Sequence, residues 1–245
     1  MGWTDCIFDL YGTLVDIHTD EEKPELWIEL ADLYKRYGAI YKPEMLKQSY
    51  HRLVQEELQG KQQFRQDTHE SYPEIQLETV FQSLFLEKDI LTDTRLVEKV
   101  GKQFRFMSID YIRLYDGAKE LLAALRKAGK RIWLLSNAQR MFTIPELQFL
   151  QLENCFDGIY LSSDYGCKKP ERQFFDVLLH EQQILPEQAV MIGNDGICDI
   201  QGAKQVGLST IYIRSNISPK EPLPQADYVL ESMDLNKVQH ILLHK

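Results

Sequence analysis

Short apolar runs alternate with helical patterns from residue 118 to the end of the chain. The apolar runs predict buried strands, and the segments between them carry apolar residues at steps of three and four, which predicts helices. Strands joined by helical crossovers form parallel sheets that are covered by helices on both faces. The alternation therefore predicts an α/β fold. The predicted strands are Arg131–Leu135, Gly158–Leu161, Ala189–Ile192, Thr210–Ile213 and Tyr228–Leu230.

Another apolar run, Cys6–Asp9, lies near the beginning of the chain and ends in an acid, with Gly12 three residues later. This pattern predicts a buried strand that delivers Asp9 to a sharp turn. The carboxyl ends of parallel strands face the crevice where ligands bind. Asp9 is therefore either a nucleophile in that crevice or an acid that merely ends a strand.

The segment between these two parts carries helical patterns and no strand pattern. We predict a helical cap domain over residues 15–112, inserted into an α/β core made of residues 1–14 and 113–245. The cap would lie over the carboxyl edge of the sheet. Apolar residues recur at helical spacing in residues 24–36, 43–58, 73–85 and 92–107, and residues 60–72 are predicted to form a polar loop.

The net charge of −9, from 37 acidic residues against 28 Lys and Arg, argues against nucleic acid as the main partner. A local basic group could still hold a small anionic substrate. The four cysteines have neither CxxC spacing nor histidines at metal-ligand intervals, so we expect reduced thiols and a cytoplasmic protein. The chain has no apolar run of the ~20 residues that cross a bilayer, so we expect no membrane association. We expect a monomer or a homodimer.

Polar motifs follow the other predicted strands. Each alone has an ordinary structural interpretation, as a helix-capping turn, a surface loop or a β-turn. In this order, on an alternating scaffold, they predict one site at the sheet edge together with Asp9. The motifs are Ser136-Asn137, Lys168-Lys169-Pro170 and Gly193-Asn194-Asp195, with Asp199 four residues further on.

These motifs resemble those of the haloacid dehalogenase (HAD) superfamily of hydrolases, in the subclass with a helical cap inserted after the first strand. The resemblance covers essentially the whole chain and implies a Rossmann-like core. It implies that Asp9 attacks the substrate and forms a covalent ester or aspartyl-phosphate, which water then cleaves. It rests on residues 9–14, Ser136, Lys169-Pro170, residues 193–195 and residues 199–203.

The resemblance also implies roles for the neighbouring residues. Ser136 and Lys169 would hold the charged oxygens of the substrate, and Lys169 would also counter the charge of Asp9. Asp199 would orient Lys169 or the turn, and Asn194 would lie beside a metal ion. Contacts with the substrate are implied for Asn137, Gly12 and Thr13.

A carboxylate that attacks a phosphate dianion meets like-charge repulsion of about 4 kcal/mol per charge pair at 4 Å. A Mg²⁺ ion that bridges both groups removes this repulsion, and Mg²⁺ prefers a few oxygen ligands and several waters. The predicted ligands are the carboxylates of Asp9 and Asp195 and, from the family pattern, the backbone carbonyl of Tyr11.

Tyr11 departs from the phosphatase pattern, because most phosphatases of the family have a second aspartate there, which serves as general acid. Tyrosine at this position resembles the 2-haloacid dehalogenases of the family, which attack carbon without a metal. The side chain of Tyr11 is equally well interpreted as a catalytic phenol or as an aromatic plug between core and cap. Asn194-Asp195 favours a phosphatase, since those dehalogenases carry serine and asparagine there.

Three functions follow from these residues. The first is a Mg²⁺-dependent phosphatase that acts on a small phosphorylated metabolite. The second is a 2-haloacid dehalogenase-like hydrolase, although Arg36, Arg52 and Arg65 in the cap do not match the halide-binding pattern. The third is a weakly active or non-catalytic ligand-binding protein.

Overall fold

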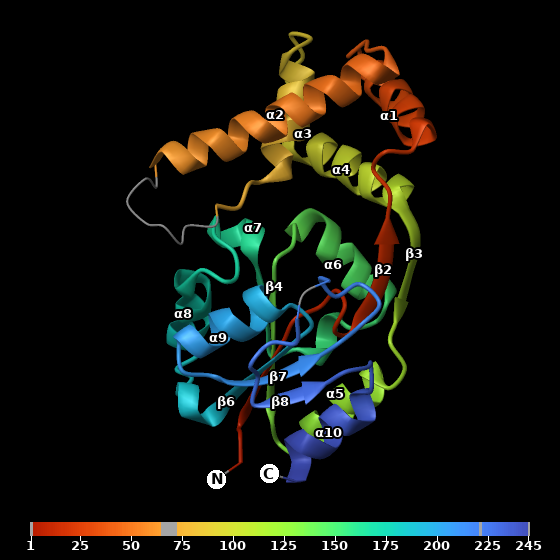
Figure 1. Ribbon diagram of the computed structural model, residues 1–245. Coiled ribbons are helices and arrows are strands. Elements are labelled where there is room, and N and C mark those ends of the chain that lie inside the picture. Colours follow the sequence, from red (N-terminus) through yellow and green to blue (C-terminus); the bar gives the residue numbers. More distant parts are fainter. Residues whose placement is uncertain (1, 65–72, 221, 245) are drawn as a thin grey trace.

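The computed structural model describes residues 2–64, 73–220 and 222–244. Its main sheet consists of β1 (Asp5–Phe8), β4 (Arg131–Ser136), β5 (Gly158–Leu161), β6 (Ala189–Gly193), β7 (Ser209–Ile213) and β8 (Tyr228–Leu230). These six strands are parallel, in the order β5-β4-β1-β6-β7-β8 (Figure 1). The α/β prediction is therefore confirmed. β1 lies between β4 and β6 although more than a hundred residues separate it from β4 in the chain.

Helices cover both faces of this sheet. The first face packs against α5 (Ala118–Lys127), α6 (Arg140–Phe149) and α10 (Leu235–His244), and the other against α8 (Arg172–Glu181) and α9 (Gly202–Gln205). Successive β1 side chains join opposite clusters: Cys6 and Phe8 lie on the first face and Ile7 on the other. This double burial explains why residues 6–8 of β1 are all apolar rather than alternating. Asp5 at the start of the strand is buried as well, and it pairs with Arg131 and accepts from Trp133 Nε1 at 2.8 Å. Short helical turns complete the core: η1 (Glu153–Cys155), α7 (Ser162–Tyr165) and η2 (Pro186–Gln188).

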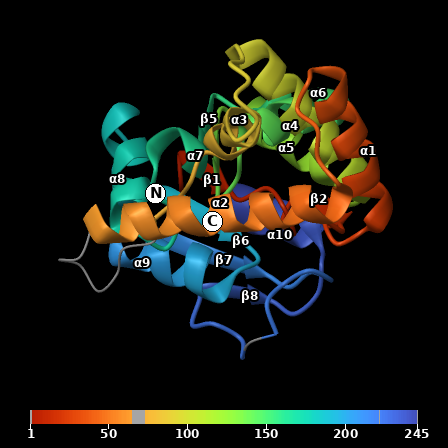
Figure 2. The ribbon, with the colours of Figure 1, turned by 90° about the horizontal axis from the view of Figure 1, so that it is seen from above.

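Four helices follow β1, the number predicted: α1 (Pro24–Arg36), α2 (Pro43–Phe64), α3 (Leu77–Leu86) and α4 (Thr94–Ser108). The third is predicted from residue 73 but begins only at Leu77, because residues 73–76 are not helical and Pro73 forms a β-bridge with Cys167. The four helices surround an apolar cluster of their own, and two residues of α6, Met141 and Phe142, also belong to it. Seen from above, α2 runs across the molecule in front of the strands (Figure 2). The predicted loop at 60–72 is wrong for residues 60–64, which continue α2, and its remainder lies outside the described residues.

The prediction that this insert lacks strands is wrong. Val15–Thr19 (β2) and Ile109–Leu114 (β3) form an antiparallel ribbon at its two ends. β3 is half-exposed and shows no regular alternation of buried residues, so its sequence carries little strand signal. The pairing joins segments about ninety residues apart, which local periodicity does not reveal. The domain boundaries at residues 15 and 112 fall inside this ribbon and stay a prediction.

The segment before α3 contacts loops that follow β4 and β5. The Leu77 backbone N–H donates to Gln139 Oε1 at 3.1 Å, and the Gln76 side chain donates to the Ser163 carbonyl at 3.2 Å. Glu74, which is nearly buried, accepts from the Ser162 hydroxyl at 2.6 Å. These contacts place part of the helical insert against the carboxyl edge of the sheet. Within residues 2–64, 73–220 and 222–244, no helix is long and apolar enough to cross a membrane.

Asp16 of β2 fastens the ribbon to the core. Its buried carboxylate accepts from Arg113 Nε of β3 at 2.8 Å and from Asn216 Nδ2, which follows β7, at 2.8 Å. Tyr111 also donates to it at 3.2 Å. Burial alone would raise the pKa of Asp16, but these three hydrogen bonds together outweigh burial and lower it.

We expect Asp16→Asn to lower the free energy of unfolding by about 1–3 kcal/mol at pH 7. A lowered pKa in the folded state gives stability that is present above the unfolded value of about 3.9 and is lost as the pH falls below it. The difference between wild type and variant should therefore shrink between pH 5 and pH 3, as measured by urea unfolding. The control is Asp110→Asn, on the exposed side of the ribbon, which should change stability little. A difference that is constant across this pH range would contradict the prediction.

Candidate active site

Asp9 is the first residue after β1, and its backbone N–H still donates to the Ile192 carbonyl of β6 at 3.0 Å. This bond holds Asp9 level with the end of its neighbouring strand. The Asp9 carboxylate then meets side chains from other loops. Its Oδ1 accepts from Lys169 Nζ at 2.8 Å and from Ser136 Oγ at 3.2 Å, and its Oδ2 lies 3.4 Å from Thr13 Oγ1. Thr13 of the same turn and two residues from distant parts of the sequence, Ser136 and Lys169, therefore converge on the Asp9 carboxylate, and Asp9 is 7% exposed.

Lys169 is almost fully buried between two carboxylates. Its ammonium group donates to Asp9 Oδ1 and, at 2.6 Å, to Asp199 Oδ1. Burial alone would lower the pKa of Lys169, but attraction to Asp199 and Asp9 outweighs burial and raises it. The lysine is thus a permanent cation at neutral pH. For Asp199 itself, burial raises the pKa, Lys169 opposes this shift and Asp9 adds to it.

Asn137 clamps the backbone of Lys169. The Lys169 N–H donates to Asn137 Oδ1 at 2.8 Å, and Asn137 Nδ2 donates to the Lys169 carbonyl at 2.9 Å. The peptide bond between Lys169 and Pro170 is cis. Both polar groups of the Asn137 amide bond to the Lys169 backbone, so Asn137 positions the lysine. Its contact with a substrate stays a prediction.

Asp195 begins the π-helical turn η3 (Gly196–Gln201), and its Oδ1 accepts from the N–H groups of Ile197 and Cys198, each at 2.8 Å. Its own N–H donates to Asp199 Oδ2 at 2.9 Å. Asp199 therefore contacts both Lys169 and this turn, the two places where an orienting role was predicted. The helix predicted from residue 200 is corrected, because the π turn comes before α9.

Two glycines make these close approaches possible. A Cβ on Gly193 would lie 2.2 Å from Asp199 Oδ2, so a side chain there would displace Asp199. Gly12 has φ +84°, in the left-handed region, and its Cβ would lie 2.2 Å from Asn194 Nδ2. Gly12 thus lets the turn after Asp9 approach the end of β6. Its predicted contact with a substrate stays a prediction.

Thr13 and Asn194 join these two loops. The Thr13 hydroxyl, fully buried, lies 3.3 Å from Asn194 Oδ1 as well as near Asp9. Asn194 Nδ2 in turn donates towards Ser215 and Ser218, at 3.5 and 3.4 Å. The sequence analysis missed these two serines. The sequence could have indicated them in the same way as the other motifs, because they are polar residues that follow the end of a parallel strand, β7, at the same edge of the sheet.

The Tyr11 phenol does not share the partners of Asp9. Its hydroxyl donates to Glu146 Oε2 at 2.5 Å and lies 3.1 Å from Thr143 Oγ1, both on α6. Burial and the Glu146 carboxylate raise the pKa of Tyr11. The phenol therefore stays protonated and hydrogen-bonded within the core. The sequence analysis did not identify Glu146, because an acid in the middle of a helix carries no motif.

The predicted metal ligands lie at one edge of the sheet. β1 and β6 are adjacent, with Phe8 opposite Ile192, so Asp9 and Asp195 follow neighbouring strand ends. Asp9 and Asp199 flank the ammonium of Lys169, and Asp195 follows the neighbouring strand, so three carboxylates lie at this edge of the sheet beside one lysine. This excess of negative charge favours a cation. Among the described residues, no three His, Cys, Asp or Glu side chains form a metal-binding group by themselves. Two carboxylates, a backbone carbonyl and waters nevertheless suit Mg²⁺, so the donor chemistry fits.

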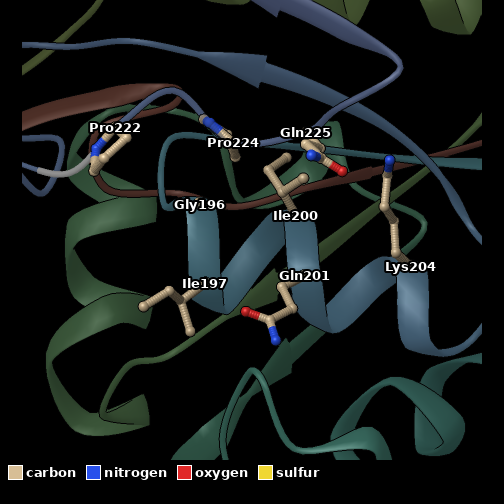
Figure 3. A pocket seen from close by; sticks show the side chains of 8 residues that line it. All are labelled: Gly196, Ile197, Ile200, Gln201, Lys204, Pro222, Pro224 and Gln225. Carbon is tan, nitrogen blue, oxygen red and sulfur yellow. The ribbon is translucent and has the colours of Figure 1, made fainter.

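A pocket of about 410 Å³ lies on the outer side of η3 (Figure 3). Ile197 and Ile200 of η3 line it, together with Pro222 and Pro224 from the loop before β8. None of the residues around Asp9 lines this pocket. The pocket adjoins the turn after Asp195, and neither Asp9, Ser136 nor Lys169 contributes to it.

Curated relatives are similar to about half of this chain. Glyceraldehyde 3-phosphate phosphatase from Pyrococcus furiosus is 30% identical over 129 residues, which are 50% of this chain and 52% of the relative. Phosphoserine phosphatase from Thermus thermophilus is 28% identical over 130 residues, which are 51% of this chain and 49% of the relative. The chain thus spans about half the length of these relatives.

Solved structures share the fold over nearly the full length. The putative HAD-hydrolase YfnB from Bacillus subtilis, bound to magnesium, superposes with a TM-score of 0.56 at 22% identity, covering 99% of each chain. A 2-haloacid dehalogenase from Pseudomonas syringae superposes with a TM-score of 0.62 at 19% identity, covering 98% of each chain. A family model for haloacid dehalogenase-like hydrolases matches residues 6–207. The resemblance seen in the motifs is therefore confirmed, and this chain belongs to the haloacid dehalogenase-like hydrolase family.

Proposed function

We propose that this chain is a Mg²⁺-dependent phosphatase that hydrolyses a small phosphorylated metabolite through an aspartyl-phosphate on Asp9. The main observation behind the proposal is that two acids, Asp9 and Asp195, follow the ends of the adjacent strands β1 and β6. The relatives named as phosphatases support it. The substrate is expected to be small and anionic, and a cytoplasmic location and a monomeric or homodimeric state stay predictions.

The reaction begins with attack by a carboxylate oxygen of Asp9 on phosphorus. The bond from phosphorus to the leaving oxygen breaks, and Lys169 and Ser136 hold the phosphoryl oxygens. Water then attacks the aspartyl-phosphate, releases phosphate and restores the Asp9 carboxylate. Mg²⁺, held by Asp9, Asp195 and the Tyr11 carbonyl, would neutralise the repulsion between carboxylate and phosphate.

The dehalogenase alternative rests on Tyr11, but the arginines named for it in the sequence do not support it. Arg36 is exposed, Arg52 is paired with Glu56 and Glu87, and Arg65 lies outside the described residues. Neither Arg36 nor Arg52 is thus arranged to hold a halide beside Asp9.

A release assay separates the candidate functions. We expect the purified protein to release phosphate from p-nitrophenyl phosphate with Mg²⁺ and to lose this activity in EDTA, because the single charge of Lys169 does not offset the repulsion of two carboxylates and a phosphate dianion. Chloride release from 2-chloropropionate is measured in parallel. Chloride release in EDTA would instead support the dehalogenase, and no release of either product would support a binding protein.

Asp9→Asn should lower kcat by roughly a thousandfold or more, since it removes the nucleophile. The control is Asp176→Asn on the exposed side of α8, where the acid pairs with Arg172, and this variant should keep wild-type kcat. Steady-state phosphate release measures both. Wild-type kcat in Asp9→Asn would exclude Asp9 as the nucleophile.

The rate should depend steeply on the leaving group. Because the Tyr11 phenol is held by Glu146, it gives no proton to the leaving oxygen, and loss of a general acid typically costs ~10²–10⁴ in rate. We expect aryl and acyl phosphates to react far faster than alkyl phosphates. The measurement is single-turnover rate against leaving-group pKa, and a flat plot would contradict the prediction.

A further inference from the structure

A buried ion pair connects Tyr11 to the helical insert. Glu146 accepts the Tyr11 hydroxyl on one carboxylate oxygen and accepts from Arg105 Nε on the other, at 2.6 Å. Arg105 belongs to α4 and Glu146 to α6, and their side chains are 15% and 7% exposed. The turn after β1, the core helix α6 and the insert helix α4 therefore meet at this pair.

The ion pair depends on both partners. In this buried setting each charge lacks most of the solvation that water would give, so each needs the other. The Arg105 guanidinium also lies 5.9 Å from the centre of the Tyr11 ring and 5.4 Å from that of Phe142. If α4 moved away from α6, Glu146 would lose its cation and the Tyr11 ring would lose a contact.

Tyr11 is part of the turn that carries the catalytic groups. The Leu10 carbonyl accepts from the N–H groups of Thr13, Leu14 and Val15, so the turn is compact. Thr13 in this turn lies against the Asp9 carboxylate. A constraint on the Tyr11 side chain is therefore passed to the backbone on which Asp9 and Thr13 lie.

We propose that Arg105 and Glu146 are positioning residues that act through Tyr11 and hold the turn at residues 10–15 in the arrangement that aims Asp9 at the substrate. Attack by Asp9 then depends on α4 being docked on α6. This inference rests on the proposed function, because it concerns the same attack by Asp9. It adds that Arg105, a residue of the helical insert, affects the rate of attack by Asp9 through Glu146 and Tyr11.

The first test removes both charges together. Arg105→Met/Glu146→Leu leaves no buried charge without its partner, and such replacements of buried pairs often preserve stability. We expect the melting temperature to stay close to wild type, while kcat for p-nitrophenyl phosphate falls about tenfold or more at little-changed KM, since a small misplacement of a reacting group can cost ~10². The matched control is Glu98→Gln/Lys102→Met, which removes an exposed pair on the same helix and should keep wild-type kcat.

A second variant, Tyr11→Phe, keeps the ring and removes only the hydroxyl, with its bonds to Glu146 and Thr143. We expect it to lower kcat as the double variant does. Combining all three substitutions should add little further loss, because residues that act as one unit are not additive. Additive losses, or equal losses in the Glu98→Gln/Lys102→Met control, would overturn the proposal. If the double variant does not fold, the test is the kcat of Tyr11→Phe compared with that of wild type and of the Glu98→Gln/Lys102→Met control.

Hydrogen exchange gives a readout that does not depend on activity. The amide hydrogens of Thr13, Leu14 and Val15 should exchange severalfold faster in Arg105→Met/Glu146→Leu than in wild type. Their exchange rates should stay at the wild-type value in the Glu98→Gln/Lys102→Met control. Unchanged exchange together with unchanged kcat would overturn the positioning role. Faster exchange in a protein whose wild type releases no phosphate would overturn the proposed function and leave the positioning role standing.

Discussion

The rest of the candidate site depends on one buried cation. Lys169 places its ammonium group between Asp9 and Asp199, away from water, where a lone charge of either sign would be strongly destabilising. The two carboxylates compensate the charge of Lys169, and Lys169 in turn holds the Asp9 carboxylate in place. Asp199 extends the arrangement, because it also accepts the backbone N–H of Asp195. Asp9, Lys169 and Asp199 are thus parts of one electrostatic unit.

The parallel sheet supplies the frame for this unit. Adjacent parallel strands end at one edge, so loops that are far apart in sequence are brought within hydrogen-bond distance there. Close approach further requires small residues at two points, Gly12 and Gly193, because a Cβ at either would overlap a neighbouring side chain. The strands bring the loops together, and the glycines allow the final contacts.

Tyr11 shows how a different residue at one position changes which groups a side chain of the site contacts. At the position of the family's second aspartate, it turns its hydroxyl to Glu146 rather than to the partners of Asp9. A group that would otherwise serve the leaving oxygen is here used to join the turn to α6. In the proposed phosphatase, the chemistry would therefore rely on the electrostatics around Lys169 more than on proton donation by Tyr11.

The sequence by itself determined the α/β core and the family, because apolar periodicity and motif order at strand ends are local features that are written in neighbouring residues. It also named most residues that meet around Asp9. Only the tertiary structure decided the β2–β3 ribbon, the π turn after Asp195, and the Tyr11, Glu146 and Arg105 cluster. Each of these depends on residues distant in the chain or on the exact spacing of packed elements. Such pairings leave no periodic signal, since their free energy comes from partners that only the folded chain brings together.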